Sequence, residues 1–444
     1  MDMIRTHPLA AVLVLGMIVR CVVAPLLSFS YDLSFWVATS QGMEGGRDIY
    51  ETSYFWYTPL WGYILGILTW IGNVAGLAVP GIIVPELVTD AVQTSIPGMT
   101  VTSIGANLLY KAPLFVIDTV TALIVHQTVV HLTADKRKAA IAAALWYLCP
   151  LVIWSSAVAC MFDSLSAMFA LIGFYFTIKE RYLPAGIALS VAVSAKVFPI
   201  CLVLVILAYV LSKHKDDVTS ALKHIGTFVG GALLAAFAIY FPVMLSGNLY
   251  KSFEFFYARS ESVSGPFNPV SMIVNLSYNS VIQLAPILIV ALILIGIKMY
   301  KSDPADRDRN LILASVLSFA VIFLWPPTPT YPVVMVPFLA MAICVCGEKL
   351  LVRSWVLFSV LMTAEALIIF NTQLFYSLAA FTDLLDLGSL ISATQANSGL
   401  FGAMEHICRY TGFIPAISVF VIAWRHNWLG RLRLLEWWRR AADA

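Results

Sequence analysis

Charged side chains that stand beside or inside apolar segments are the first candidates for chemistry in this sequence. Asp32 follows the first apolar run, Asp163 separates two such runs, and Lys196 follows another. An ionisable group in such a setting is costly, so it indicates a functional site by default. A carboxylate such as Asp32 would act as a general base. The alternative is a solvated acid that caps a short helix at the membrane surface.

Two cations extend this set of residues. Lys196 would hold an anionic phosphate as a point charge, and the guanidinium fork of Arg259 suits phosphate oxygens. Alternatively, Lys196 snorkels to an interface or pairs with Asp163, and Arg259 pairs with Glu254 or Glu261. The residue types therefore indicate a site for a compound that bears a phosphate.

Further polar and aromatic residues are the candidates for substrate binding. They are Arg47, Asp48, Tyr57, Asp163 and Asn268, with Asp48 as the second choice for the acid. The sequence has no glycine-rich phosphate loop and no nucleotide motif. The spacings of its seven cysteines, and of His126 and His131, are not those of a metal site. We therefore expect no metal and no cofactor.

The composition determines the class of protein. The 444 residues are 60% hydrophobic and 12% charged. A water-soluble domain carries about 25% charged residues, so only a polytopic membrane protein fits. The net charge of +2 gives no indication of nucleic-acid binding.

Apolar segments of about 20 residues cross a membrane, and basic clusters mark the cytoplasmic ends. The segments between the basic clusters predict about twelve crossings with both termini inside. We place them near 8–28, 106–132, 139–160, 163–178, 182–198, 199–212, 223–245, 272–299, 310–326, 329–346, 352–371 and 410–425. The expected fold is an all-α helical bundle that forms one integral membrane domain over residues 1–444.

This topology predicts three outer loops, at residues 29–105, 246–269 and 371–409. The candidate residues then lie at one outer rim. Residues 58–79 are apolar enough to cross, but a lone crossing would place the basic cluster 136–138 outside. We therefore expect an interfacial or re-entrant helix there, rich in Trp and Tyr. A pair of crossings within 58–100 is the alternative.

Several blocks of residues resemble the catalytic subunits of the GPI mannosyltransferases. The matching blocks are Tyr31-Asp32, Gly46-Arg47, Tyr50, Tyr54–Leu60, Leu145-Trp146, Cys149-Pro150, Ser155-Ser156, Asp163-Ser164, Lys196–Pro199, Phe255–Tyr257 and Phe267–Pro269. The resemblance runs from Ala10 to Val345. That family belongs to the GT-C glycosyltransferases and has an Asp-x-Asp pattern in its first outer loop. Here Ser30 replaces the first Asp, which leaves Asp32 as the single matched acid.

The resemblance implies a GT-C fold and an inverting hexosyl transfer, with mannose as the expected sugar. The donor would be a dolichyl- or polyprenyl-phosphate sugar and the acceptor a lipid-linked glycan or glycolipid at the outer or lumenal face. Asp32 would be the base, while Lys196 and Arg259 would bind the donor phosphate. The implied partners are these lipids and a small accessory membrane subunit, in the plasma membrane or the endoplasmic reticulum.

Two other readings of the sequence stay open. A transporter or flippase for a lipid or a small anion also explains a bundle with buried polar groups, although transporters usually show inverted repeats. A non-catalytic partner subunit that has kept the fold is the third reading, and the Ser30 departure supports it.

Overall fold

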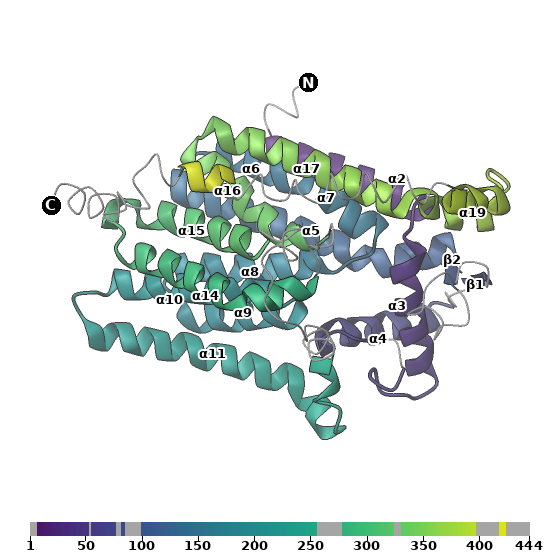
Figure 1. The fold of residues 1–444 in the computed structure, drawn as a ribbon, viewed down its shortest axis with the longest axis horizontal. Coiled ribbons are helices and arrows are strands. Elements are labelled where there is room, and N and C mark those ends of the chain that lie inside the picture. The colour runs from purple at the N-terminus through teal and green to yellow at the C-terminus, as the bar shows by residue number, and fades with distance from the viewer. Residues whose placement is uncertain are drawn as a thin grey trace.

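A computed structural model describes residues 7–52, 55–76, 81–84, 99–254, 278–323, 330–396 and 417–422. Long helices run side by side and form a bundle (Figure 1). They are α2 (Pro8–Leu26), α5 (Ile104–Thr133), α8 (Asp163–Ile178), α9 (Tyr182–Ala195), α10 (Cys201–Lys213), α11 (Val218–Leu245), α14 (Tyr278–Tyr300), α15 (Arg307–Ile322), α16 (Val336–Cys346) and α17 (Lys349–Phe370).

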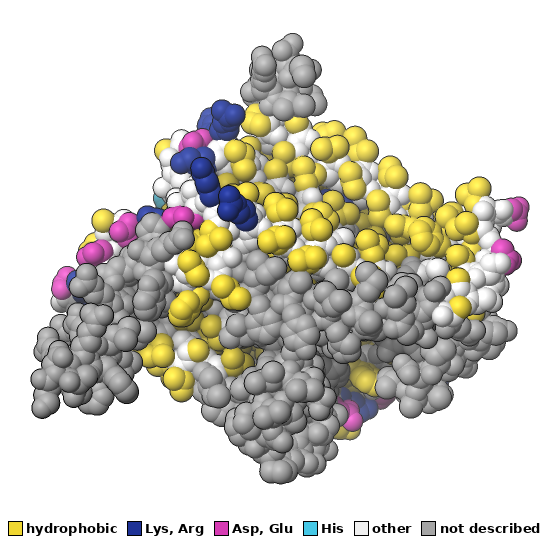
Figure 2. Space-filling model, turned by 45° about the horizontal axis from the view of Figure 1, so that its top comes forward, with side chains coloured by type: hydrophobic (Ala, Val, Ile, Leu, Met, Phe, Trp, Pro, Cys, Tyr) yellow, Lys and Arg dark blue, Asp and Glu magenta, His cyan; other side chains and the backbone are white. Residues whose placement is uncertain are grey.

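The outer surface of the bundle is apolar, as a membrane protein requires. Exposed side chains on α2 and α17 include Val14, Ile18, Val356 and Val360, and Figure 2 shows this apolar face. Within the described residues, four helices are long and apolar enough to cross a membrane, or five if one bent pair counts as a span. The expected count of about twelve crossings is not confirmed. The segment predicted at 410–425 is described only over 417–422.

The segment predicted as one helix over 139–160 is broken in the structure. It consists of α6 (Lys136–Tyr147), α7 (Pro150–Ile153) and the π-helical turn η3 (Trp154–Val158), with a bend of 47° between α6 and the rest. Pro150 lacks an amide N–H and its ring crowds the preceding turn, which favours a bend or a break at this position. The break leaves the carbonyl of Tyr147 able to accept a bond from another helix.

The turns near the predicted cytoplasmic end contact one another. Lys213 pairs with Glu180 at 2.9 Å, and Arg307 Nε donates to the Ser212 hydroxyl at 3.2 Å. These contacts bring together the turns after α8, after α10 and before α15. This arrangement agrees with the predicted alternation of the helices between the two ends of the bundle.

Short elements cover the opposite end of the bundle. They are α3 (Ser30–Glu44), α4 (Pro59–Val74), β1 (Gly81–Val84), β2 (Met99–Thr102), η7 (Asn371–Phe375), α18 (Tyr376–Phe381) and α19 (Leu387–Ala396), and most of them gather at one side of Figure 1. β1 and β2 pair antiparallel, with Ile82 opposite Val101. The all-α expectation therefore misses a two-stranded sheet, because four-residue apolar strands cannot be distinguished from a membrane segment by their pattern.

Helix α4 lies within the apolar segment at 58–79. Its 16 residues span about 24 Å at 1.5 Å per residue, less than the ~30 Å of a bilayer core. The hydroxyl of Tyr63 donates to the carbonyl of Ile239 on α11 at 2.9 Å. These facts fit a re-entrant or interfacial helix, and its place in a membrane stays a prediction.

Glycines allow α9 and α11 to pack backbone against backbone. A Cβ at Gly186 would collide with the carbonyl oxygen of Phe228, and a Cβ at Gly231 with that of Leu183. Small residues at helix contacts permit this close approach in membrane proteins. The pair holds α9 in place, and the last turn of α9 carries the start of the site described below.

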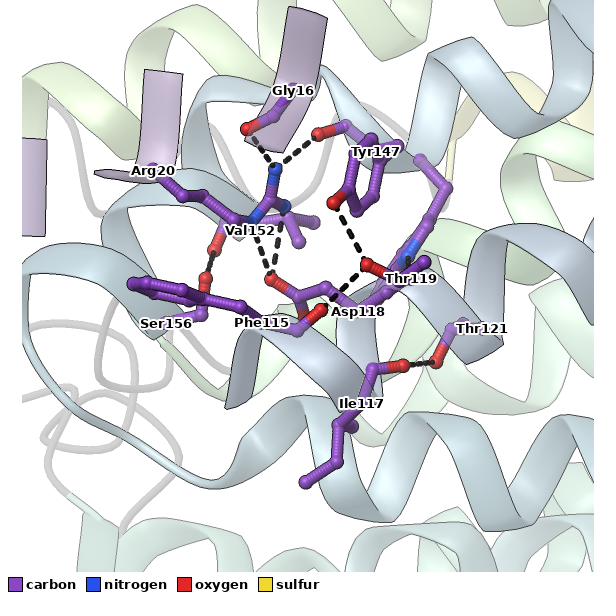
Figure 3. A network of polar contacts seen from close by, with 11 residues as sticks. Gly16, Arg20, Phe115, Ile117, Asp118, Thr119, Thr121, Tyr147, Val152 and Ser156 are labelled. Carbon is purple, nitrogen blue, oxygen red and sulfur yellow. Dashed lines mark hydrogen bonds and ion pairs between the residues drawn. The ribbon is translucent and has the colours of Figure 1, made fainter. Parts of the chain in front are cut away.

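A buried ion pair attaches α2 to the bundle (Figure 3). Arg20 Nε and Nη2 each lie 2.9 Å from Asp118 Oδ2 on α5, and both side chains are fully buried. Arg20 Nη1 donates to the Tyr147 carbonyl at 2.9 Å and to the Gly16 carbonyl at 3.2 Å. The guanidinium also lies 4.2 Å from the centroid of the Tyr147 ring. The pair thus uses the carbonyl that the break after α6 left free.

Candidate functional site

Lys196 and Asp163 meet at the end of the bundle that the short elements cover. Asp163 is the first residue of α8 and Lys196 follows the last residue of α9. The two helices are consecutive and antiparallel, so these ends are neighbours. Lys196 Nζ lies 3.8 Å from Asp163 Oδ1, and the side chains are 6% and 0% exposed. The ion pair that the sequence offered as one alternative is therefore present.

Three aromatic rings enclose the ammonium group of Lys196. Its Nζ lies 4.4 Å from the ring centroid of Phe162, 4.6 Å from that of Tyr57 and 5.1 Å from that of Tyr331. Ring faces attract a cation at such distances. We call these three residues the aromatic cage. Trp61 stacks on Phe162 at 4.9 Å between centroids and supports the cage from behind.

Asp32 lies beside this pair, in the first turn of α3. The charges of Lys196 and Asp163 both act on its carboxyl group. Burial raises the pKa of Asp32 to about 7, an effect that Lys196 opposes and Asp163 reinforces. The side chain keeps partial exposure. The structure thus brings four of the predicted residues into one place: Asp32, Tyr57, Asp163 and Lys196.

The turn from α2 to α3 determines where Asp32 stands. Lys111 Nζ on α5 donates to the carbonyls of Ala24 at 2.8 Å and Leu27 at 2.6 Å, which the end of α2 leaves free. The amide of Phe29 donates to the carbonyl of Val158 at 3.3 Å, and the Ser28 amide to that of Leu374 at 3.0 Å. Lys111 was not among the predicted site residues. The sequence feature that could have identified Lys111 is its position within an apolar helical segment, where a charged side chain is costly.

The backbone before Asp163 has an unusual conformation. The π-helical turn η3 ends at Val158, and Cys160 has a positive φ of 55°. The carbonyl of Cys160 accepts a hydrogen bond from Trp36 Nε1 on α3 at 3.2 Å. π-turns and left-handed non-glycine residues occur often at functional sites. This segment carries Phe162 and Asp163 into the cage and binds α3 at the same time.

Other predicted residues lie elsewhere. Arg47 and Asp48 follow the far end of α3, and the 12 residues from Asp32 to Glu44 at 1.5 Å each place them about 18 Å away. Asp48 Oδ1 accepts the amide of Tyr50 at 2.9 Å and so stabilises a local turn. Arg47 and Asp48 thus lie at the other end of α3 from Asp32, and their part in substrate binding stays a prediction. Arg259 and Asn268 lie outside the described residues.

Several polar atoms on the same elements make no hydrogen bond within the described part of the chain. They are buried atoms of Ser30, Ser155 and Lys196. Native structures leave few such atoms unsatisfied, and those that remain often face water or a ligand. In the same described residues, no three His, Cys, Asp or Glu side chains group as metal ligands. The site is thus a polar cluster inside an aromatic wall, and it is suited to a hydroxylated or charged organic group.

Comparisons with known proteins point to one family. The model of the family described as GPI transamidase subunit PIG-U matches residues 41–263, which is half of the chain. No curated protein sequence matches the chain. The predicted relation to GPI mannosyltransferases in particular is not confirmed.

Two solved structures are similar at low identity. ArnT from Cupriavidus metallidurans in the apo state has 14% sequence identity and a TM-score of 0.46, over 96% of this chain and 78% of that chain. The same protein bound to undecaprenyl phosphate gives 13% and 0.42, over the same shares. A likeness this distant defines neither the fold nor a site of this chain.

Proposed function

Because the chain belongs to the GPI transamidase subunit PIG-U family, we propose that it is a membrane subunit of a GPI transamidase. Its part in the complex is to bind the lipid-linked glycan at the site around Lys196. Its partners are then the other subunits, the glycolipid and the surrounding lipids. In a eukaryotic cell the site faces the lumen of the endoplasmic reticulum.

The observation that carries this proposal is the combination of carboxylates and aromatic rings at one place. Binding sites for organic ligands are mostly apolar or aromatic, with a few polar groups that fix orientation. On this proposal the partly exposed ring of Tyr57 packs against a sugar and the Asp32 carboxyl accepts bonds from its hydroxyls, while Tyr331 holds Lys196 in place. Asp32, Tyr57 and Tyr331 come from different parts of the chain and meet only in the folded protein.

The same geometry favours binding over glycosyl transfer. A lipid-phosphate leaving group needs a cation that is ready to accept its growing charge. The cation that the described residues place here is Lys196, and it is already paired with Asp163 and enclosed by three rings. The other predicted cation, Arg259, lies outside the described residues.

Deletion of the gene in its own host tests this proposal. Cells without the chain should fail to attach anchors to a reporter protein and should accumulate the complete lipid-linked glycan. Re-expression of the full chain should reverse both effects, and Tyr57→Ala should reverse them only in part. Loss of the glycolipid itself would contradict the proposal, because a missing sugar transferase stops its synthesis.

One observation favours a second candidate function, the transfer of a hexose such as mannose from a dolichyl- or polyprenyl-phosphate donor. Asp32 is partly exposed and has a pKa of about 7, which suits a general base at neutral pH. A base contributes about 10²–10⁴-fold to a rate. If the chain is such an enzyme, purified protein should move radiolabel from polyprenyl-phosphate-mannose into a glycolipid, and Asp32→Asn should remove that activity. If no transfer occurs, the role as a transamidase subunit is the candidate function that remains.

A further inference from the structure

Asp118 is a buried carboxylate that the proposed function does not use. It lies on α5, and its side chain is fully buried. Arg20 on α2 binds one of its oxygens at 2.9 Å, and Trp146 Nε1 donates to its backbone carbonyl at 2.9 Å. A buried carboxylate beside its counter-ion accepts hydrogen bonds and donates none. Asp118 is therefore an anchor for donor groups on other elements.

One such donor is Ser164, the second residue of α8. The hydroxyls of Ser156 and Ser164 both reach the Asp118 carboxyl group. The Ser156 hydroxyl gives its proton to the carbonyl of Val152 at 3.0 Å (Figure 3). The Ser164 hydroxyl is fully buried and is the one that donates to the carboxylate. Asp118 thus binds α2 through Arg20 and α8 through Ser164.

Ser164 and its neighbour Asp163 point to opposite partners of α8. Consecutive residues of an α-helix stand about 100° apart around its axis. Ser164 faces Asp118 on α5, and Asp163 faces Lys196 at the end of α9. The two contacts together determine the rotation of the first turn of α8. Because the ion pair of Asp163 already spans 3.8 Å, a small rotation of this turn would break it.

The other contact of Asp118 leads to Asp32. Arg20 lies on α2, and the short turn after α2 leads into α3, which carries Asp32 in its first turn. The buried Arg20–Asp118 pair fixes the position of α2 along α5. It therefore also fixes the level at which α3 begins. Both carboxylates of the site depend on the same anchor.

We propose that Asp118 is a positioning residue of the candidate site. Through Arg20 it sets the position of α2, and through Ser164 it sets the rotation of the first turn of α8, so that Asp32 and Asp163 meet in one place. The effect on glycan binding rests on the proposed function, whereas the effect on the ion pair of Asp163 does not.

A double-mutant cycle in the purified full chain tests the link without a ligand. Ser164→Ala removes the donor and keeps the carboxylate of Asp118. If Ser164 positions Asp163, the ion pair with Lys196 is already weakened in this variant. The double variant Ser164→Ala with Lys196→Met should then lose less melting temperature than the sum of the two single losses.

Thr119→Val is the matched control for this cycle. Thr119 follows Asp118 on α5, and its hydroxyl shares a hydrogen bond of 2.8 Å with the hydroxyl of Tyr147 (Figure 3). This bond joins α5 to α6 and does not involve α8. The loss caused by Thr119→Val should therefore add fully to that of Lys196→Met. The inference is overturned if the two cycles behave alike, whether both are additive or both are not.

Labelling by a photoreactive lipid-linked glycan tests the consequence for the site. Ser164→Ala should weaken the affinity about fivefold, the equivalent of one hydrogen bond. Thr119→Val should leave it unchanged. The apolar pair Arg20→Met with Asp118→Leu regains stability relative to the single variants. It gives Ser164 no acceptor, so its affinity should stay about tenfold below that of the wild type.

The two measurements separate the inference from the proposed function. Wild-type affinity in the apolar pair variant would overturn the positioning role of Asp118 and leave the proposed function intact. No labelling of the wild-type chain would overturn the proposed function, and the double-mutant cycle would still decide whether Ser164 and Asp118 position Asp163.

Discussion

Lys196 is neutralised inside the fold by Asp163, with 3.8 Å between the ammonium nitrogen and the nearer carboxylate oxygen. The sequence left two roles open for this lysine, binding a phosphate or pairing with Asp163. The structure contains the pair and surrounds the ammonium group with three aromatic rings, and the phosphate role stays a prediction. A buried cation that is already paired organises a site more than it attracts a ligand. It fixes Asp163 and the cage, and under the proposed function Asp32 is the group that meets the ligand.

The pair makes a prediction about stability. Lys196→Met leaves Asp163 buried and uncompensated, which should lower the free energy of unfolding by about 3–5 kcal/mol. The double change Lys196→Met with Asp163→Leu should cost less, because it removes both charges. Thermal unfolding of the purified protein in one detergent measures all three forms. A double variant no more stable than Lys196→Met would show that the pair does not matter for folding.

Asp32 gives the site a pH dependence. Its pKa of about 7 means that the carboxyl is neutral below this value and charged above it. Binding of a ligand whose hydroxyl groups donate to the charged carboxylate should therefore strengthen as pH rises from 6 to 8 and weaken as pH falls through about 7. Asp32→Asn should flatten this profile. Titration of ligand binding in matched buffers measures it, and an unchanged slope in the variant would assign the titration to another group.

The raised pKa of Asp32 acts on stability in the opposite direction: the folded protein loses stability as pH rises. Because the folded value lies above the ordinary value of 3.8, the folded state holds its proton more tightly than the unfolded chain. The contribution of Asp32 to stability is complete below about pH 4 and is lost as pH rises through about 7. The difference in melting temperature between wild type and Asp32→Asn should thus change in favour of the variant between pH 5 and pH 8. A constant difference would contradict the raised pKa.

The Arg20–Asp118 pair is a separate test of the fold. Asp118→Asn or Arg20→Met leaves one fully buried partner without its counter-charge. Each change should cost about 3–5 kcal/mol, and the apolar pair Arg20→Met with Asp118→Leu should recover part of this loss. Limited proteolysis near the start of α5 would report whether α2 has detached. Wild-type stability in both single variants would show that the Arg20–Asp118 pair does not stabilise the fold.

Four glycines offer a matched experiment on α9 and α11. Gly186→Ala and Gly231→Ala place a methyl group against backbone carbonyls and should destabilise the protein by about 1–3 kcal/mol. Gly226→Ala and Gly230→Ala meet no atom of the described chain within 4 Å. They should be neutral or stabilise the helix by up to about 1 kcal/mol. Melting temperatures in one detergent compare the four, and equal losses would contradict the packing described for α9 and α11.

Lys111 is predicted to position Asp32. Lys111→Met removes two hydrogen bonds that hold the turn between α2 and α3. We expect the pH midpoint of ligand binding to move, because Asp32 leaves its place beside Lys196. Lys111→Arg, which keeps the charge and the donors, should restore much of the wild-type midpoint. If the Lys111→Met protein binds its ligand with an unchanged pH midpoint, the turn between α2 and α3 keeps its conformation without Lys111.

The sequence predicts the local features of this protein well and the distant ones poorly. The bounds of α8 agree with the prediction of 163–178, because a helix start at an acid and a stop at a basic turn are local signals. The approach of Asp32 to Lys196 followed from placing both at one rim. The partner of Arg20 stands 98 residues away in the chain, and no pattern in a single sequence indicates it. Helix α3 was taken for a loop because it lies across the end of the bundle and mixes polar with apolar residues.

The most direct test of the central claim is photolabelling of the purified chain with a lipid-linked glycan that carries its reactive group on the sugar, followed by mapping of the labelled peptides. The account predicts labels on the first turns of α3 and on the segment from Trp154 to Asp163, with Tyr57→Ala reducing both. It also predicts that Gly226→Ala, which lies far along α11, leaves the labelling unchanged. Labels confined to the lipid-facing side chains of α2, α11 or α17 would contradict the claim that this site receives the glycan.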